Sequence, residues 1–225
     1  MSSSLPSHSK TTGTPAPLPP SFPPPLIDNK DPCPPPVPKL IVGSEGPQGA
    51  YLVELLVYNG YPFKDHWAYF VCSQSNSGVG VLIHAAGDVR SGFRFEIKRS
   101  YDLRASGRIP SNRIALQWVN SFYFDETTMF NNGTYKVDTL PVCDFEASMH
   151  KAKAPEKTLN SVEDMVRAFL SFFLYPRYFI AGETSAGMKV HQRNCQTWIV
   201  ESAGFLVQDG IFNPEVAVYL NAIKQ

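Results

Sequence analysis

Proline gathers at one end of this chain of 225 residues, because thirteen of its twenty prolines lie in residues 1–38. Proline cannot donate a backbone hydrogen bond, and a segment this rich in it buries too little apolar surface to fold alone. We therefore expect residues 1–38 to form a disordered tail and residues 39–225 to form a single globular domain. Residues 17–20 and 35–38 are candidate ligands for a proline-binding domain of a partner, with a simple solvated tail as the alternative.

Charge and cysteine usage narrow the class of protein. Twenty basic residues balance twenty acidic ones, so we expect no nucleic-acid partner. The chain has no signal-peptide pattern, and no apolar run approaches the roughly 20 residues that a membrane-spanning helix needs. Its four cysteines are scattered and lack zinc-site spacing, which favours a reducing compartment. We predict a cytoplasmic protein without a membrane span.

The first part of the folded region has the pattern of β-structure. Its segments are either apolar and rich in aromatic and β-branched residues, or alternate apolar with polar residues. The strand candidates are residues 52–58, 66–71, 79–84, 93–97, 114–118 and, less regular, 134–142. Gly87-Asp88 predicts a turn between two of them. We expect an antiparallel sheet of about five strands.

The last third changes to helical periodicity. Residues 162–175 predict an amphipathic helix that ends at Pro176, and residues 195–207 predict a second with Asn194 as N-cap. Asn213-Pro214-Glu215 has the cap, the first-turn proline and the acid that open a last helix. Strands followed by helices indicate an α+β fold in which the sheet packs against C-terminal helices.

Cys195 has the best context for reactivity among the cysteines. It follows Asn194 at a predicted helix start, where unpaired N–H groups and the helix dipole favour negative charge. We therefore expect its pKa to be lowered, which gives a useful fraction of thiolate at neutral pH. Cys195 is the candidate nucleophile, and a nucleophile of this kind needs a base and a group that orients the base.

Two of the five histidines suit those roles. His66 opens one apolar strand and His84 closes the next, and in an antiparallel pair these two ends lie side by side. We expect the imidazoles within hydrogen-bond reach, one as base and the other fixing its tautomer. The other histidines are His8 in the tail, His150 in a lysine-rich segment predicted as exposed loop, and His191 in a predicted loop.

These residues resemble a known family. His66-Trp67-Ala68-Tyr69, Ile83-His84 and Asn194-Cys195 are similar to the pattern of the circularly permuted papain-like cysteine enzymes, particularly the lecithin–retinol acyltransferase-like branch. Those proteins have a His-aromatic strand, a second His on the following strand and a late Asn-Cys that opens a helix. The resemblance implies a permuted papain-like fold, with His66 as base, His84 as third polar member and Cys195 as nucleophile.

The chain also departs from that branch. Residues 196–198 are Gln-Thr-Trp where the acyltransferases usually have an acidic and then an aromatic residue, and the interval between the histidines is longer. No long apolar segment follows Val207, which argues against a lipid substrate. Together with Arg99-Ser100-Tyr101-Asp102, residues 195–198 are more similar to uncharacterised small proteins of filamentous fungi, for which secondary metabolism is the expected setting.

Each of these residues also has a purely structural interpretation. A cysteine at a helix start is often a small buried residue, and a strand-end histidine is often a polar residue at the rim of a sheet. Zinc bound by the three residues is a further alternative, but a fourth ligand is missing, so we expect neither metal nor cofactor. Candidate supporting residues are Asp65, Asp88, Gln74 and Gln196, the last near the oxyanion.

Two functions of different classes follow. In the first, Cys195 attacks an ester, thioester or amide carbonyl, and water or an amine or hydroxyl acceptor then resolves the acyl-enzyme. The protein is then a hydrolase or an acyltransferase acting on an acyl substrate. In the second, a catalytically silent module of the same fold binds a small molecule or a protein. A Cys195 pKa below its ordinary value favours the first function.

Overall fold

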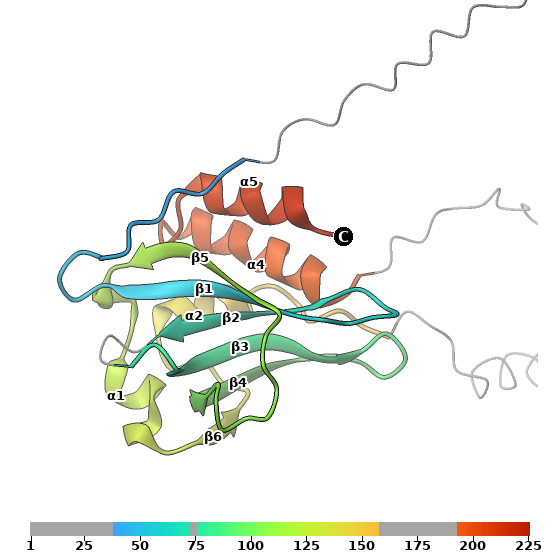
Figure 1. Ribbon diagram of the computed structural model, residues 1–225, viewed down its shortest axis with the longest axis horizontal. Coiled ribbons are helices and arrows are strands. Elements are labelled where there is room, and N and C mark those ends of the chain that lie inside the picture. The colour runs from blue at the N-terminus through green and yellow to red at the C-terminus, as the bar shows by residue number, and fades with distance from the viewer. Residues whose placement is uncertain (1–37, 73–75, 158–192) are drawn as a thin grey trace, which may run out of the picture. The chain divides into compact units, whose positions relative to one another are not determined.

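The computed structural model describes residues 38–72, 76–157 and 193–225. Within them the chain forms an α+β fold, as the order of strands and helices predicted (Figure 1). The predicted tail (all but Pro38), the predicted helix over residues 162–175, His8, His191 and Gln74 lie outside the described residues. No helix in the described ranges is long and apolar enough to cross a membrane.

One antiparallel sheet contains six strands in the order β5-β1-β2-β3-β4-β6 (Figure 1). The strands are β1 (Tyr51–Tyr58), β2 (His66–Cys72), β3 (Val79–Asp88), β4 (Gly92–Asp102), β5 (Asn112–Val119) and β6 (Lys136–Asp138). The predicted turn at Gly87-Asp88 was wrong, because both residues still belong to β3. The turn follows Asp88, whose carboxylate accepts hydrogen bonds from the backbone N–H groups of Arg90 and Ser91.

In sequence, the helices come after most of the strands. They are α1 (Glu126–Met129), α2 (Asp144–His150), α4 (Cys195–Gln208) and α5 (Pro214–Ile223), with short 3-10 turns at Ser121–Tyr123 and Asn131–Gly133. The structure confirms both predicted helix starts at Cys195 and Pro214. The predicted loop around His150 was wrong: His150 ends α2, a seven-residue helix whose N-cap residue makes no side-chain hydrogen bond and so leaves little sequence signal.

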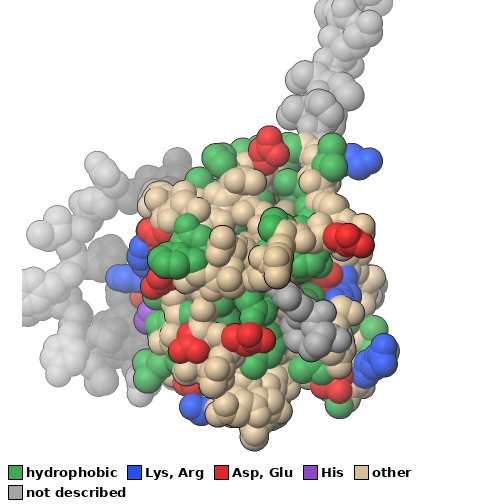
Figure 2. Space-filling model, turned by 90° about the vertical axis from the view of Figure 1, so that its left-hand side faces the viewer, with side chains coloured by type: hydrophobic (Ala, Val, Ile, Leu, Met, Phe, Trp, Pro, Cys, Tyr) green, Lys and Arg blue, Asp and Glu red, His purple; other side chains and the backbone are tan. Residues whose placement is uncertain are grey.

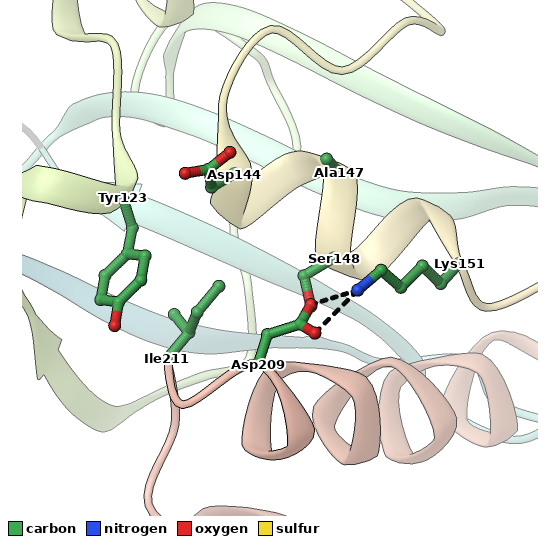
Figure 3. A pocket seen from close by; sticks show the side chains of 7 residues that line it. All are labelled: Tyr123, Asp144, Ala147, Ser148, Lys151, Asp209 and Ile211. Carbon is green, nitrogen blue, oxygen red and sulfur yellow. Dashed lines mark hydrogen bonds and ion pairs between the residues drawn. The ribbon is translucent and has the colours of Figure 1, made fainter.

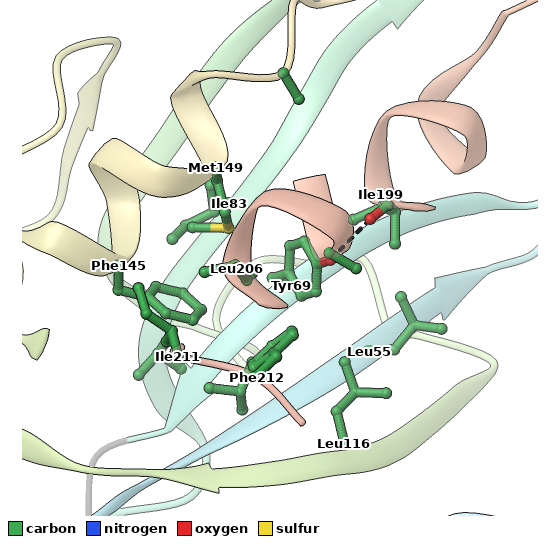
Figure 4. Packing of buried hydrophobic residues seen from close by; sticks show 14 of the residues in the cluster. Leu55, Tyr69, Ile83, Leu116, Phe145, Met149, Ile199, Leu206, Ile211 and Phe212 are labelled. Atoms are coloured by element: carbon green, nitrogen blue, oxygen red, sulfur yellow. Dashed lines mark hydrogen bonds between the residues drawn. The ribbon is translucent and has the colours of Figure 1, made fainter. Parts of the chain in front are cut away.

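The main core lies between one face of the sheet and helices α2 and α4 (Figure 4). Trp198, Ile199 and Leu206 of α4 are fully buried there, and the Tyr69 hydroxyl of β2 donates a hydrogen bond of 2.9 Å to the Ile199 carbonyl. A smaller apolar cluster that includes Phe70 and Leu82 covers the other face of the sheet. The strong burial of α4 against β2 fixes where this helix begins.

A buried arginine joins the far edge of the sheet to α2. Arg99 of β4 is 1% exposed, and its guanidinium donates to both carboxylate oxygens of Glu146 at 2.9 and 3.1 Å. The same group also contacts Asp138 and the carbonyls of Met129 and Leu140. Because its donors are all directed at these acceptors, we interpret Arg99 as a structural residue that locks β6 and α2 onto β4.

Candidate active site

Strands β2 and β3 separate at the end of the sheet where α4 begins. β2 pairs with β1 from its first residue, as the Tyr58–His66 pair shows. Its pairing with β3 starts only at Tyr69 and Ile83, so the residues before Tyr69 are not paired with β3. Helix α4 contacts both strands and starts with Cys195 beside the first residues of β2. This separation leaves room for side chains of three elements to meet.

His66 and His84 meet at this separation. His66 Nε2 lies 2.7 Å from His84 Nδ1, and the two rings are nearly perpendicular, at 80°. This confirms the prediction that the two imidazoles lie within hydrogen-bond reach. His84 does not close its strand, however, because β3 continues to Asp88. The contact between the two histidines is thus made by their imidazole rings and does not depend on adjacent strand ends.

Glu96 of β4 completes a chain of three polar side chains. It lies directly opposite His84 in the β3–β4 ladder, and its Oε1 is 3.2 Å from His84 Nε2. Its carboxylate also pairs with Arg94 at 2.8 Å and with Lys98 at 3.6 Å. Burial alone would raise the pKa of Glu96, but these cations and His84 lower it, so the carboxylate is ionised at neutral pH.

Both imidazoles are neutral at pH 7. Burial is the main cause that lowers the pKa of His66 to about 3, and the positive charge that His84 gains in acid lowers it further. Burial also lowers the pKa of His84 to about 4, with Lys98 as the next cause and Glu96 acting in the opposite direction. Neutral imidazole has one donor and one acceptor nitrogen, so the order of hydrogen bonds along the chain assigns the tautomers.

The ionised carboxylate of Glu96 fixes that order. Because Glu96 only accepts, His84 Nε2 must carry the hydrogen, and His84 Nδ1 must then accept from His66 Nε2. The lone pair of His66 is left on Nδ1, and Nδ1 makes no hydrogen bond with another described residue. The chain from Glu96 through His84 to His66 therefore ends in an unprotonated nitrogen, which is able to accept a proton.

Cys195 is the first residue of α4. Asn194 caps the helix as predicted: its side chain accepts a hydrogen bond from the Thr197 backbone N–H at 3.1 Å, and Thr197 returns the contact to the Asn194 N–H. Cys195 is 6% exposed, and its Sγ lies 3.8 Å from the Asp65 carbonyl oxygen. In this arrangement the thiol hydrogen is directed at the main chain and not at an imidazole.

The prediction of a lowered Cys195 pKa was wrong. Burial raises the pKa of this thiol, and the backbone N–H groups of Trp67, Gln196 and Cys195, which act to lower it, do not compensate. A helix N-terminus favours the thiolate, but desolvation in the crowded space between α4 and β2 outweighs that effect. The resting state therefore has a neutral thiol and two neutral imidazoles in the lining of one cavity.

The predicted supporting residues that the structure describes, Asp65, Asp88 and Gln196, make other contacts. The side-chain amide of Gln196, which is fully buried, donates to the Asp65 carbonyl at 2.9 Å and to Gln225 at 3.1 Å. The Asp65 carboxylate bonds Gln225 in turn, and Asp88 caps the turn after β3. Gln196 is thus engaged within the protein and does not stand ready to bind an oxyanion, contrary to the prediction.

A cavity of about 1140 Å³ opens over these side chains. The size is ample for a small-molecule ligand. Cys195, His66, His84 and Glu96 line it together with residues of the β1–β2, β3–β4 and β4–β5 connections. The remaining lining residues are Gly60, Pro62, Phe63, Lys64, Ala86, Gly87, Asp88, Val89, Arg90, Phe93, Lys98, Arg108, Asn194 and Gln225.

Other regions of the described chain have fewer of the features of a reactive site. A cavity of about 260 Å³ between α2 and the end of α4 contains a Lys151–Asp209 ion pair and is lined by neither histidine nor cysteine (Figure 3). At the end of the sheet opposite the Cys195 cavity, acidic, basic and apolar side chains are interspersed on the surface (Figure 2). Among the described residues no group of three or more His, Cys, Asp and Glu side chains is arranged to hold a metal ion.

Glu96 is the member of this site that sequence reasoning missed. Its signal was present, since it is the acidic residue between apolar Phe95 and Ile97 in an alternating strand. Only the strand register shows that it faces His84.

Comparison with known proteins gives a match of residues 53–213 to the model of a family of unknown function, DUF6540. No curated protein and no solved structure matches the chain.

Proposed function

The chain belongs to the DUF6540 family, and we propose that its pocket carries out acyl-group chemistry with Cys195 as nucleophile and His66 as base. The observation that supports the proposal is the ordered chain from Glu96 through His84 to His66. It leaves an unprotonated Nδ1 on an imidazole that lines the same cavity as the Cys195 thiol. We assign His84 and Glu96 as positioning residues, because they act through His66.

The first half of the reaction forms an acyl-enzyme. In the proposed step the Cys195 thiol leaves the Asp65 carbonyl and passes its hydrogen to His66 Nδ1, which lines the same cavity. As the proton moves to His66, the sulfur attacks the carbonyl carbon of an ester, thioester or amide. The leaving group departs with the proton from His66, and a thioester links the acyl group to Cys195. The backbone N–H groups of Cys195 and Gln196 at the start of α4 stabilise negative charge here.

The second half regenerates the thiol. His66 Nδ1 takes a proton from water, or from an amine or hydroxyl acceptor, which then attacks the thioester. The acyl group leaves on that acceptor, and the proton returns to the sulfur. Water gives a hydrolase and the other acceptors give a transferase. Because the thiol and the imidazoles are neutral at rest, the proton moves from sulfur to His66 during the attack. The mechanism does not start from a thiolate–imidazolium pair.

A second candidate function is ligand binding without catalysis. The raised pKa of Cys195 and the contact of its thiol with the main chain favour this alternative. In that case the pocket would bind a small molecule, and the three polar side chains would orient it.

An assay of thioester and ester cleavage separates the two candidates. A background variant with Cys33, Cys72 and Cys143 replaced by Ala is compared with the same variant carrying Cys195→Ser. We expect turnover of an activated short-chain thioester in the background and a loss of about 10³-fold or more with Cys195→Ser. Equal turnover in the two proteins would contradict the proposal. Binding of the thioester without turnover in the background would favour the second candidate.

Three further proposals concern the location of the protein, its relationship to permuted papain-like enzymes and its tail. The described cysteines Cys72, Cys143 and Cys195 are free thiols, which supports a reducing, cytoplasmic location. The permuted papain-like relationship rests on the order of His66, His84 and Cys195 and on the α+β architecture. The proline-rich tail is proposed as a ligand for a proline-binding domain, on its composition alone.

A further inference from the structure

The cavity over Cys195 has an excess of positive charge, although the whole chain is formally neutral. Its lining contains four cationic side chains and two acidic ones. Both acids are already engaged, since Glu96 bonds His84, Arg94 and Lys98, and Asp88 accepts two backbone N–H groups. Lys98 is thus one of the partners of Glu96, and Lys64 donates to the main-chain oxygen of Gln225 at 2.6 Å, so both lysines are engaged as well.

Two of the cations are arginines without an internal acceptor. Arg90 lies on the β3–β4 turn and Arg108 on the β4–β5 connection, and both line the cavity. Neither guanidinium makes an ion pair or hydrogen bond with another residue in the described part of the chain. The backbone of Arg108 is held by the Ser106 hydroxyl, which contacts its N–H at 3.3 Å and its carbonyl at 3.2 Å. The loop thus presents a charged side chain from a constrained position.

Arg108 also acts on the site itself. Burial is the main cause that lowers the pKa of His66 and His84, and the charge of Arg108 lowers both further. Because Arg108 lines the same cavity as both imidazoles and Cys195, its guanidinium can attract an anion bound there. Apolar Pro62, Phe63 and Phe93 line the same cavity and suit the uncharged part of a ligand.

From this arrangement we infer that the pocket selects acyl compounds that carry an anionic group, a carboxylate or a phosphate, which Arg108 binds while the acyl carbonyl lies at Cys195. Guanidinium groups bind both anions through paired N–H donors. This inference rests on the proposed function for the acyl part. The recognition of the anion does not depend on turnover.

The charge at the thiol can be measured with two alkylating reagents. Iodoacetate is anionic and iodoacetamide is neutral, and both react with the same thiolate, so a change in the Cys195 pKa cancels in the ratio of their rates. We expect this ratio at Cys195 to exceed that of 2-mercaptoethanol by about tenfold at low salt and to fall as ionic strength rises. Arg108→Gln should remove most of the excess. Arg104→Gln is the matched control, because Arg104 is an exposed arginine on the same connection outside the cavity.

A second measurement identifies the anion. Monomethyl glutarate, butyl phosphate and neutral dimethyl glutarate are compared for their protection of Cys195 from iodoacetamide. Stronger protection by either anion, lost in Arg108→Gln, supports the inference and assigns the carboxylate or the phosphate. A rate ratio equal to that of 2-mercaptoethanol, or equal protection by the neutral diester, would overturn it and leave the proposed function intact. Failure of both reagents to reach Cys195 would overturn both.

Discussion

The two ends of strand β2 hold two buried thiols in opposite chemical surroundings. Cys195, at 6% exposure, lies beside the first residues of β2, and Cys72, at 4%, is its last residue. The Cys72 thiol donates to the Glu54 carboxylate at 3.1 Å, and Arg113 binds the same carboxylate. Burial, followed by the charge and hydrogen bond of Glu54, raises the Cys72 pKa far above its ordinary range.

The difference shows that burial alone does not decide reactivity. At Cys72 the neighbouring carboxylate stabilises the protonated thiol and opposes its ionisation. At Cys195 the thiol contacts the Asp65 carbonyl, backbone N–H groups act to lower its pKa, and an imidazole with an available nitrogen lines the same cavity. A thiol whose pKa is raised by burial can still react when a base takes its proton during the attack.

The largest effect is expected from His66→Ala. Without the base, acylation of Cys195 by an activated thioester should slow by about 10²–10⁴-fold, while alkylation of Cys72 stays unchanged. Stopped-flow measurement of acylation, with peptide mapping for both cysteines, checks this. An equal rate in the wild type and in His66→Ala would remove His66 from the mechanism.

Acid should weaken the His66 end of β2. In the folded protein the pKa values of His66 and His84 are lowered to about 3 and about 4, against about 6.5 in an unfolded chain. Between pH 6.5 and 4 the unfolded chain therefore binds protons that the folded protein does not, so stability falls as pH falls. We expect a loss of roughly 2–4 kcal/mol in the free energy of unfolding from pH 7 to pH 5. Urea titrations of wild type and of a His66→Gln/His84→Gln variant measure it, and the same pH dependence in both would contradict the assignment.

Glu96→Gln tests the ordering of hydrogen bonds. A side-chain amide can donate to His84 Nε2, which allows the reversed tautomers and places a hydrogen on His66 Nδ1. We expect acylation of Cys195 to slow by about tenfold and the nitrogen NMR shifts of both imidazoles to report mixed tautomers. Arg94→Gln is the control, since it removes another partner of Glu96 and leaves the carboxylate in place. Unchanged nitrogen shifts in Glu96→Gln would show that Glu96 does not fix the tautomers.

The smallest effect is expected at Cys72. Glu54→Gln removes the negative charge that opposes ionisation, so the Cys72 pKa should fall and its alkylation by iodoacetamide at pH 8 should rise a few fold. Arg113→Gln should act in the opposite direction, because the arginine lowers the Cys72 pKa. Peptide-resolved alkylation rates measure both variants. A slower reaction in Glu54→Gln would refute this description of the Cys72 end.

The sequence predicted the parts of the site that depend on local pattern. Asn194 as the cap of α4 and the approach of His66 to His84 follow from a capping residue and from strand periodicity, and the structure confirms both. Glu96 could not be assigned, because its contact with His84 depends on the register between β3 and β4. The Cys195 pKa was predicted in the wrong direction, since the desolvation that raises it comes from tertiary packing of α4 on β2.

The location of a trapped acyl group shows whether Cys195 is the nucleophile and His66 its base. The full-length protein is incubated with an activated thioester, quenched in acid within the first turnover and digested, and the mass of each cysteine peptide is measured. We expect the acyl group on Cys195 in the wild type and in the Arg104→Gln variant, and a much smaller acylated fraction in His66→Ala. An acyl group on Cys72 or Cys143, or equal acylation of Cys195 with and without His66, would contradict this expectation.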